Sequence, residues 1–124
     1  MHVFPVAKYR LIRERLEAEG IAEAGDFEEP RSATVEELLT VHTEGYLQCL
    51  EDLTETPDQA VRRFEVPCTR QVLDAFRLAV GGTIQAGRRA LEMGGAANLS
   101  GGFHHAFADR GEGFCLLNDL AVAI

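Results

Sequence analysis

The chain has 124 residues, of which 46% are hydrophobic and 26% charged, ordinary proportions for one globular domain with a core. Its formal net charge of −8 argues against direct nucleic-acid binding, which depends on basic side chains that neutralise phosphates. No apolar run approaches the ~20 residues of a membrane-spanning helix. The three cysteines show no CxxC spacing, which favours reduced thiols. We therefore expect a cytoplasmic protein that binds neither nucleic acid nor membrane.

Apolar periodicity and capping signals predict four helices, over residues 5–19, 35–42, 44–53 and 70–93. Thr34 and Glu37 have the spacing of a capping box at the start of the second helix. Thr43 and Thr69 stand at the N-cap positions of the third and fourth helices, and Gly94 ends the fourth. Helices therefore dominate the first three quarters of the chain.

A short apolar run, residues 96–99, follows the longest helix and predicts a buried strand. The order of helix and strand predicts an α/β fold in which helices pack on a short parallel sheet. Residues 54–67 carry two prolines and no clean periodicity, so we expect a connection there. No internal repeat or interdomain linker is visible.

Residues 100–119, SGGFHHAFADRGEGFCLLND, carry the chemistry. They begin just past the predicted strand, where open α/β sheets place their ligands. Glycines surround His104 and His105 and allow backbone to approach a ligand closely. Adjacent imidazoles at such a place can act as general base and general acid, because imidazole titrates near neutral pH. From the residues alone, a structural or solvated pair stays equally open.

The two histidines do not predict a metal site. Neighbouring side chains on an extended segment point to opposite faces and seldom reach one ion together. Asp109 and Glu112 are nearby carboxylates, although Asp-Arg-Gly-Glu is equally typical of a solvated turn. Asn118 and Asp119 predict the cap of a following helix.

GGFHHA, followed after a short gap by GFCLLND, closely resembles the active-site segment of histone deacetylases. The similarity is nearest to bacterial histone-deacetylase-like hydrolases and the class IV branch. Upstream, HVFPVAKYRLIRERL resembles the first helix region of the family, VHTEGYLQCL its VH-x-x-x-Y-L segment and GGTIQAGRRAL the helix before the active-site strand. The resemblance covers nearly the whole chain. It implies a partial arginase/deacetylase-like three-layer α/β fold.

The resemblance also implies roles for individual residues. His104 would be the base that receives the proton of a water molecule, and His105 the electrostatic or acid partner that assists departure of the amine. The backbone carbonyl of Gly113 would hold the substrate amide, and Phe114 would form an aromatic wall of the acyl-lysine channel. Cys115 would be a buried structural thiol beside that channel. The substrate implied is an acyl-lysine peptide or an acylated small amine.

The sequence also departs from the family. Zinc ligands of the family come from an Asp-x-His pair and a later aspartate, and the 124 residues contain no Asp-x-His. The aspartates that orient the two histidines, and the tyrosine that polarises the substrate carbonyl, have no counterpart either. The resemblance thus implies that residues 1–124 are the incomplete N-terminal part of a single deacetylase domain. We expect this part to bind no zinc alone and to be inactive alone, since metal-assisted hydrolysis depends on the ion.

Two other interpretations stay open. The chain could be a non-catalytic α/β fragment or regulatory module that dimerises, or an incomplete reading of a longer gene. In either case its exposed apolar faces favour self-association or pairing with the missing C-terminal part of the domain.

Overall fold

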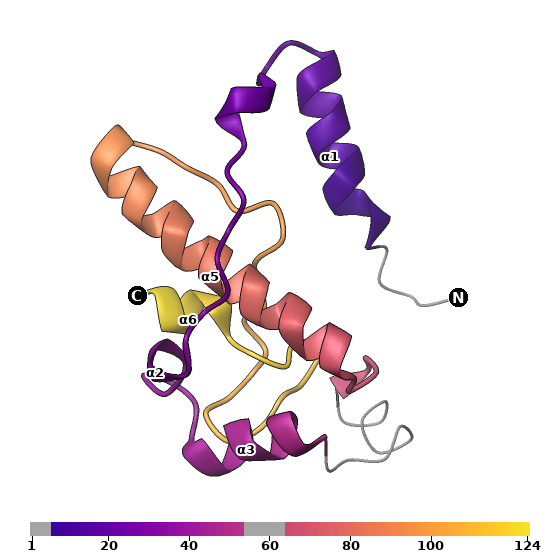
Figure 1. The fold of residues 1–124 in the computed structure, drawn as a ribbon, viewed down its shortest axis with the longest axis vertical. Coiled ribbons are helices and arrows are strands. Elements are labelled where there is room, and N and C mark those ends of the chain that lie inside the picture. Colours follow the sequence, from indigo (N-terminus) through magenta and orange to yellow (C-terminus); the bar gives the residue numbers. More distant parts are fainter. Residues whose placement is uncertain (1–5, 54–63) are drawn as a thin grey trace.

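The computed structural model describes residues 6–53 and 64–124, and long helix α5 runs through the middle of the molecule (Figure 1). The elements in chain order are α1 (Ala7–Ala18), η1 (Ala24–Asp26), α2 (Val35–Leu38), α3 (Glu44–Asp52), α5 (Arg70–Met93) and α6 (Asp119–Ala123). Figure 1 shows α1 standing apart from the other helices, while α6 lies beside α5. Within the described residues, no helix is long and apolar enough to span a bilayer.

Helix α5 has the bounds predicted from its periodicity and caps. The Thr69 hydroxyl accepts a hydrogen bond from the Val72 N–H (3.3 Å), and Gly94 ends the helix with a φ of +89°. The apolar stripe is buried along the first two thirds of the helix, at Leu73, Phe76, Val80 and Ile84. It then leaves the core, because Leu91 is 91% exposed. The spacing of the apolar residues therefore predicts the helix correctly but overstates the length of its buried face.

The extended segment before α2 crosses α5 at Gly81 (Figure 1). A Cβ atom at Gly81 would lie only 1.8 Å from the carbonyl oxygen of Arg31, so only glycine permits this approach. The Ala33 N–H donates to the carbonyl of Arg77 (2.9 Å), which fixes the crossing. The core continues from this crossing toward α3 and the C-terminal loops.

The short helices begin at the predicted caps. Thr34 and Glu37 form a capping box with both reciprocal hydrogen bonds, and Thr43 accepts from the Tyr46 N–H (3.3 Å). Helix α2 ends at Leu38, four residues before the predicted end. After Leu38 the chain continues as tight turns, because the N–H groups of Thr40 and Val41 donate to carbonyls three residues back, those of Glu37 (3.3 Å) and Leu38 (3.2 Å).

The predicted strand over residues 96–99 is not found. The described residues contain no strand, and their only bridge pairs Glu112 with Cys115. A strand is defined by hydrogen bonds to a neighbour, and no described segment pairs with residues 96–99. The predicted parallel sheet is therefore not confirmed. The prediction of the first helix is nearly right, although Pro5 lies outside the described residues. Most of the predicted connection, residues 54–63, also lies outside them.

Candidate active site

The two adjacent histidines lie side by side at the surface, in a turn after α5. Their ring centroids are 4.3 Å apart with a tilt of 36°, and both side chains are exposed. The Nδ1 atom of His104 lies 3.0 Å from the carbonyl oxygen of Gly102. In the tautomer that makes this a hydrogen bond, Nδ1 carries the proton and Nε2 keeps a free lone pair. That arrangement can accept a proton from solvent at Nε2.

A second loop brings Gly113 and Phe114 against the histidine pair. Gly113 has a φ of +53°, and a Cβ atom there would lie 3.1 Å from Cγ of His105, so the loop backbone packs closely on the imidazole. Phe114 has a φ of +66°, strained for a bulky residue, and its N–H donates to the carbonyl of Phe64 (3.0 Å). The structure thus gathers all four site residues predicted from the sequence at one place.

Cys115 follows these residues and points inward. Its side chain is buried, its Sγ donates to the Gly113 carbonyl (3.3 Å), and burial raises the pKa of its thiol. A thiol with a raised pKa is a poor nucleophile. The geometry agrees with the structural role expected for it. A carbonyl oxygen has two lone pairs, so Gly113 keeps one for a ligand.

Two buried side chains that the sequence analysis left without a role anchor the second loop. His42 is 2% exposed, and its Nε2 accepts from the Asn118 N–H (3.1 Å). The Tyr46 hydroxyl donates to the Leu116 carbonyl (2.8 Å). The burial of His42 lowers its pKa, an effect that the nearby carbonyls of the 107–108 segment partly offset. The pattern VHTEGYLQCL therefore holds the loop that carries Gly113 and Phe114.

The start of α6 joins both loops. Asn118 is its N-cap, as predicted, and accepts from the Ala121 N–H (3.0 Å). Its amide also donates to the carbonyls of Ala106 (2.9 Å) and His104 (3.4 Å). Asp119 was predicted as a cap, yet it is fully buried and its carboxylate turns back to the histidine turn. Asp109, in contrast, is exposed and pairs only with neighbouring Arg110 at the surface (3.2 Å).

The described residues do not fit a zinc site by themselves. Over residues 6–53 and 64–124, no three His, Cys, Asp or Glu side chains are grouped so that they could hold one ion. Zinc sites in proteins use three or four such ligands. The two imidazoles can transfer protons, and the Gly113 backbone carbonyl can accept a hydrogen bond.

The family of this chain follows from comparison with known proteins. The histone deacetylase domain matches residues 2–124, almost the whole chain. The chain belongs to the histone deacetylase family. The resemblance of the HHA and GFC segments to the histone deacetylase family is thus confirmed.

Three relatives illustrate the range of the family. An uncharacterized protein of Picosynechococcus sp. is 40% identical over 122 residues, which are 98% of this chain and 40% of that protein. Histone deacetylase 2 of Arabidopsis thaliana is 38% identical over 131 aligned positions, covering 100% of this chain and 33% of that protein. The acetoin utilization protein AcuC of Bacillus subtilis is 34% identical, covering 99% and 34%. The chain thus spans a third to two fifths of the length of these relatives.

Solved structures share the fold. The crystal structure of a histone deacetylase homolog from Aquifex aeolicus superposes with a TM-score of 0.73 at 31% identity, over 91% of this chain and 32% of that one. A homolog complexed with SAHA gives a TM-score of 0.74 at the same identity and coverage. The arrangement of helices and loops described above is therefore that of part of a deacetylase, and the arginase/deacetylase-like fold is confirmed at that level.

Proposed function

We propose that residues 1–124 are the N-terminal part of a zinc-dependent deacetylase that hydrolyses the amides of acyl-lysine peptides or acylated small amines. The observation that carries the proposal is the exposed, adjacent pair of imidazoles packed against Gly113, in a chain of the histone deacetylase family. One loop thus offers proton-transfer groups, and the other offers a backbone carbonyl and an aromatic side chain beside them.

In this proposal His104 acts as the general base. A free Nε2 takes the proton from the water that attacks the acyl carbon. His105, in its protonated form, stabilises the charge that develops and gives its proton to the amine nitrogen when the carbon–nitrogen bond breaks. The products are a carboxylic acid and a free amine; His104 then releases the proton it took to solvent and His105 regains one from solvent, so atoms and protons balance. The resemblance to the family supports this division of roles.

The Gly113 carbonyl and the Phe114 ring would bind the substrate. A carbonyl accepts a hydrogen bond from the N–H of the scissile amide, and an aromatic ring packs on the acyl-lysine methylenes. Phe114 is half-buried, so one part of its side chain stays accessible to a ligand while another part packs on the core. Contact with the ring removes the aliphatic chain of the substrate from water, which favours binding.

We include zinc in the proposal because the family uses it. The described side chains do not by themselves fit a zinc site. The ligands would come from residues outside these 124, together with the aspartates and the tyrosine that the family uses. We therefore propose that the chain is inactive alone. A cytoplasmic location is part of the same proposal.

A chimera tests the proposed function. Residues 1–124 replace the segment with which they align in histone deacetylase 2 of Arabidopsis thaliana, and deacetylation of an acetyl-lysine peptide is measured. We expect zinc-dependent turnover that His104→Ala reduces about 10²–10⁴-fold, the usual contribution of a general base. Asp109→Asn, a change in the same loop at an exposed side chain, is the matched control and leaves turnover near that of the unmutated chimera. A chimera that folds, binds zinc and hydrolyses nothing would contradict the proposal.

The unmodified chain provides the second half of the test. With the 124-residue chain we expect no hydrolysis above the uncatalysed background, even with added zinc. We also expect the chain to bind far less than one equivalent of zinc. Turnover with about one bound zinc per chain would refute the proposed inactivity.

A non-catalytic, self-associating module is the alternative function. Large apolar side chains are exposed on the far end of α5 and near α1, among them Leu91 (91% exposed), Met93 (73%) and Ile21 (66%). Exposed apolar groups of this kind favour association. The alternative predicts a stable dimer of the chain and no activity in the chimera. The mass of the purified chain in solution, measured beside the chimera assay, separates the two.

A further inference from the structure

Asp119 has a carboxylate that none of the roles above uses. It is 0% exposed, and three donors converge on it. Oδ2 accepts from the Thr83 hydroxyl (2.5 Å) and from the Gly102 N–H (2.9 Å), and Oδ1 accepts from the Phe103 N–H (2.6 Å). A buried carboxylate needs such partners, because burial of an unpaired charge is very costly. Two of the three donors belong to the two residues directly before His104.

Thr83 and Asn98 connect this carboxylate to α5. The Asn98 amide donates to the Thr83 hydroxyl (2.9 Å) and to the Ala79 carbonyl (2.9 Å). The Thr83 hydroxyl lies 2.5 Å from Oδ2 of Asp119 and 3.3 Å from the Ala79 carbonyl, so the shorter hydrogen bond directs its hydrogen to Asp119. The oxygen of the Asn98 side chain accepts from the Ser100 N–H (3.1 Å). The carboxylate is therefore held from the middle of the longest helix.

Gly101 shows how closely the turn follows this network. A Cβ atom there would lie 2.6 Å from Oδ2 of Asp119 and 2.7 Å from Oγ1 of Thr83. Any side chain would push the turn away from the carboxylate. The first glycine of GGFHHA therefore serves the contact with Asp119, which its place in the sequence pattern alone does not reveal.

The peptide groups that donate to Asp119 also contact His104 through a carbonyl oxygen. Gly102 donates its N–H to Asp119, and its carbonyl oxygen lies 3.0 Å from Nδ1 of His104. Phe103 donates to Asp119 and stacks its ring on Phe76 of α5, with centroids 4.5 Å apart. One peptide group thus links the buried carboxylate to the imidazole.

We propose that Asp119, held by Thr83, is a positioning residue of the turn that carries His104, and that it acts on the backbone of this turn rather than on the imidazole rings. It fixes the peptides of Gly102 and Phe103, so that in the 124-residue chain the Gly102 carbonyl holds the proton of His104 on Nδ1 and leaves Nε2 free. This inference deepens the proposed function and rests on it for its catalytic meaning. Its test, in contrast, needs no turnover.

The experiment is nuclear magnetic resonance on the 124-residue chain, with amide hydrogen exchange and the imidazole nitrogen signals as readouts. Thr83→Val removes the hydroxyl and keeps the shape, whereas Thr83→Ser keeps the hydroxyl and is the matched control. Asp119→Asn removes the charge, and exposed Asp109→Asn is its matched control. Nitrogen signals report which atom of the ring carries the proton, which a merely structural role would not change.

In Thr83→Val and Asp119→Asn we expect at least tenfold faster exchange of the Gly102 and Phe103 amides, because charge-assisted hydrogen bonds protect them. We also expect the His104 signals to change from the Nδ1-protonated form to a mixture of tautomers. Thr83→Ser and Asp109→Asn keep the original signals, and the α3 amides exchange as before in every variant.

Unchanged His104 signals in Thr83→Val would overturn the inference, as would faster exchange spread evenly over α3. If Asp119→Asn does not fold, the comparison of Thr83→Val with Thr83→Ser decides alone. Failure here leaves the chimera assay untouched, and an inactive chimera leaves these signals untouched, so the two proposals fail separately.

Discussion

Helices α1 and α5 were both predicted from an apolar stripe at helical spacing, yet different forces hold them. No residue of α1 is buried, and its side chains form ion pairs with one another along the helix, such as Arg10 with Glu14 (2.5 Å) and Arg13 with Glu17 (3.2 Å). Helix α5 buries apolar residues and two glycines against the 31–33 segment, Asn98, α3 and α6. The difference teaches that periodicity predicts a helix, whereas burial depends on what the rest of the chain places beside it.

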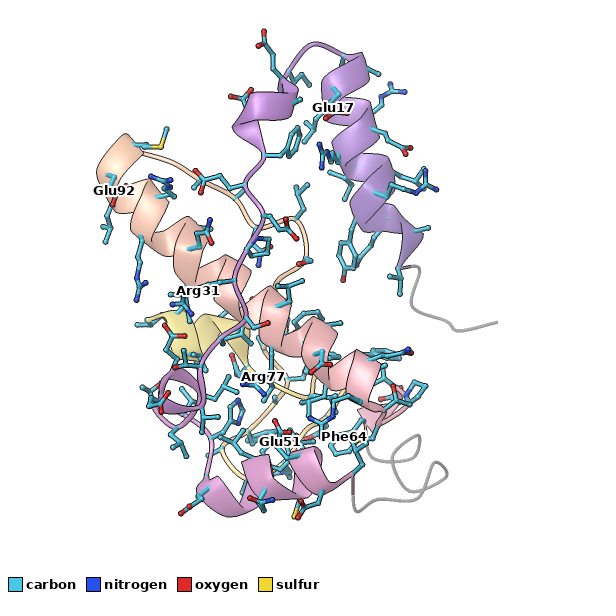
Figure 2. All side chains as sticks on the ribbon, viewed as in Figure 1. Glu17, Arg31, Glu51, Phe64, Arg77 and Glu92 are labelled. Carbon is cyan, nitrogen blue, oxygen red and sulfur yellow. The ribbon has the colours of Figure 1, made fainter. Side chains whose placement is uncertain are left out.

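Few contacts join α1 to the remainder. The guanidinium of Arg13 stacks over the Phe27 ring at 4.7 Å, beyond η1. The pKa of Tyr9 is raised by partial burial and, to a lesser degree, by the negative charge of Asp119. Figure 2 shows Glu17 at the far end of α1, well away from the Glu51 and Arg77 side chains that face each other between α3 and α5. Stability should therefore differ sharply between the two regions.

The largest effect is expected at the crossing of α5. Gly81→Ala places a Cβ atom 1.8 Å from a backbone oxygen that cannot move without its whole segment. We expect a loss of about 3 kcal/mol in the free energy of unfolding, at the upper end for overpacking. Urea denaturation followed by circular dichroism measures it.

Gly87→Ala is the matched control on the same helix. An added Cβ meets nothing within 4 Å there, and glycine is a poor helix former, so stability rises by about 0.5–1 kcal/mol. Equal losses at both glycines would show that helix propensity, and not the crossing, governs α5.

The same contrast explains how much the sequence could predict. The ends of α5 depend on Thr69 and Gly94, neighbours of the helix in sequence, so local rules find them. The burial of Asp119 depends on Thr83 and Phe103, which lie 36 and 16 residues away, and local rules interpret it as a cap. The resemblance to the family predicted roles for the two histidines, but it did not predict which buried side chains hold the loops around them. The strand over 96–99 failed for a related reason, since a strand exists only with a neighbour.

A smaller, pH-dependent effect is expected from His42. The neutral ring accepts from the Asn118 N–H, and burial lowers its pKa below the ordinary value of about 6.5. The unfolded chain regains that ordinary value and binds more protons just below it, so the free energy of unfolding falls with decreasing pH. The contribution is complete above pH ~6.5 and is lost as the pH drops through that value toward the lower folded one.

Denaturation of the wild type and of His42→Gln at several pH values tests this effect. Glutamine can accept the same hydrogen bond and does not titrate, so the slope with pH below neutrality should flatten. His42→Gln should cost about 1 kcal/mol near neutral pH, because a buried glutamine side chain loses rotamer freedom. An unchanged slope would mean that folding does not lower the pKa of His42.

The smallest effect is expected in α1. Glu14→Gln removes an exposed pair at the i,i+4 spacing, and such pairs contribute about 0.3 kcal/mol. Glu51→Gln is the contrasting change, because Glu51 joins Arg77 (2.9 Å) and Arg70 and ties α3 to α5. We expect it to cost about 1 kcal/mol, since charged hydrogen bonds are only partly screened there. Amide exchange should show the α1 amides opening locally in both variants, while the α5 amides respond to Glu51→Gln alone. Faster exchange of the α5 amides in Glu14→Gln would mean that α1 is packed on the core, and the contrast between the two helices would fail.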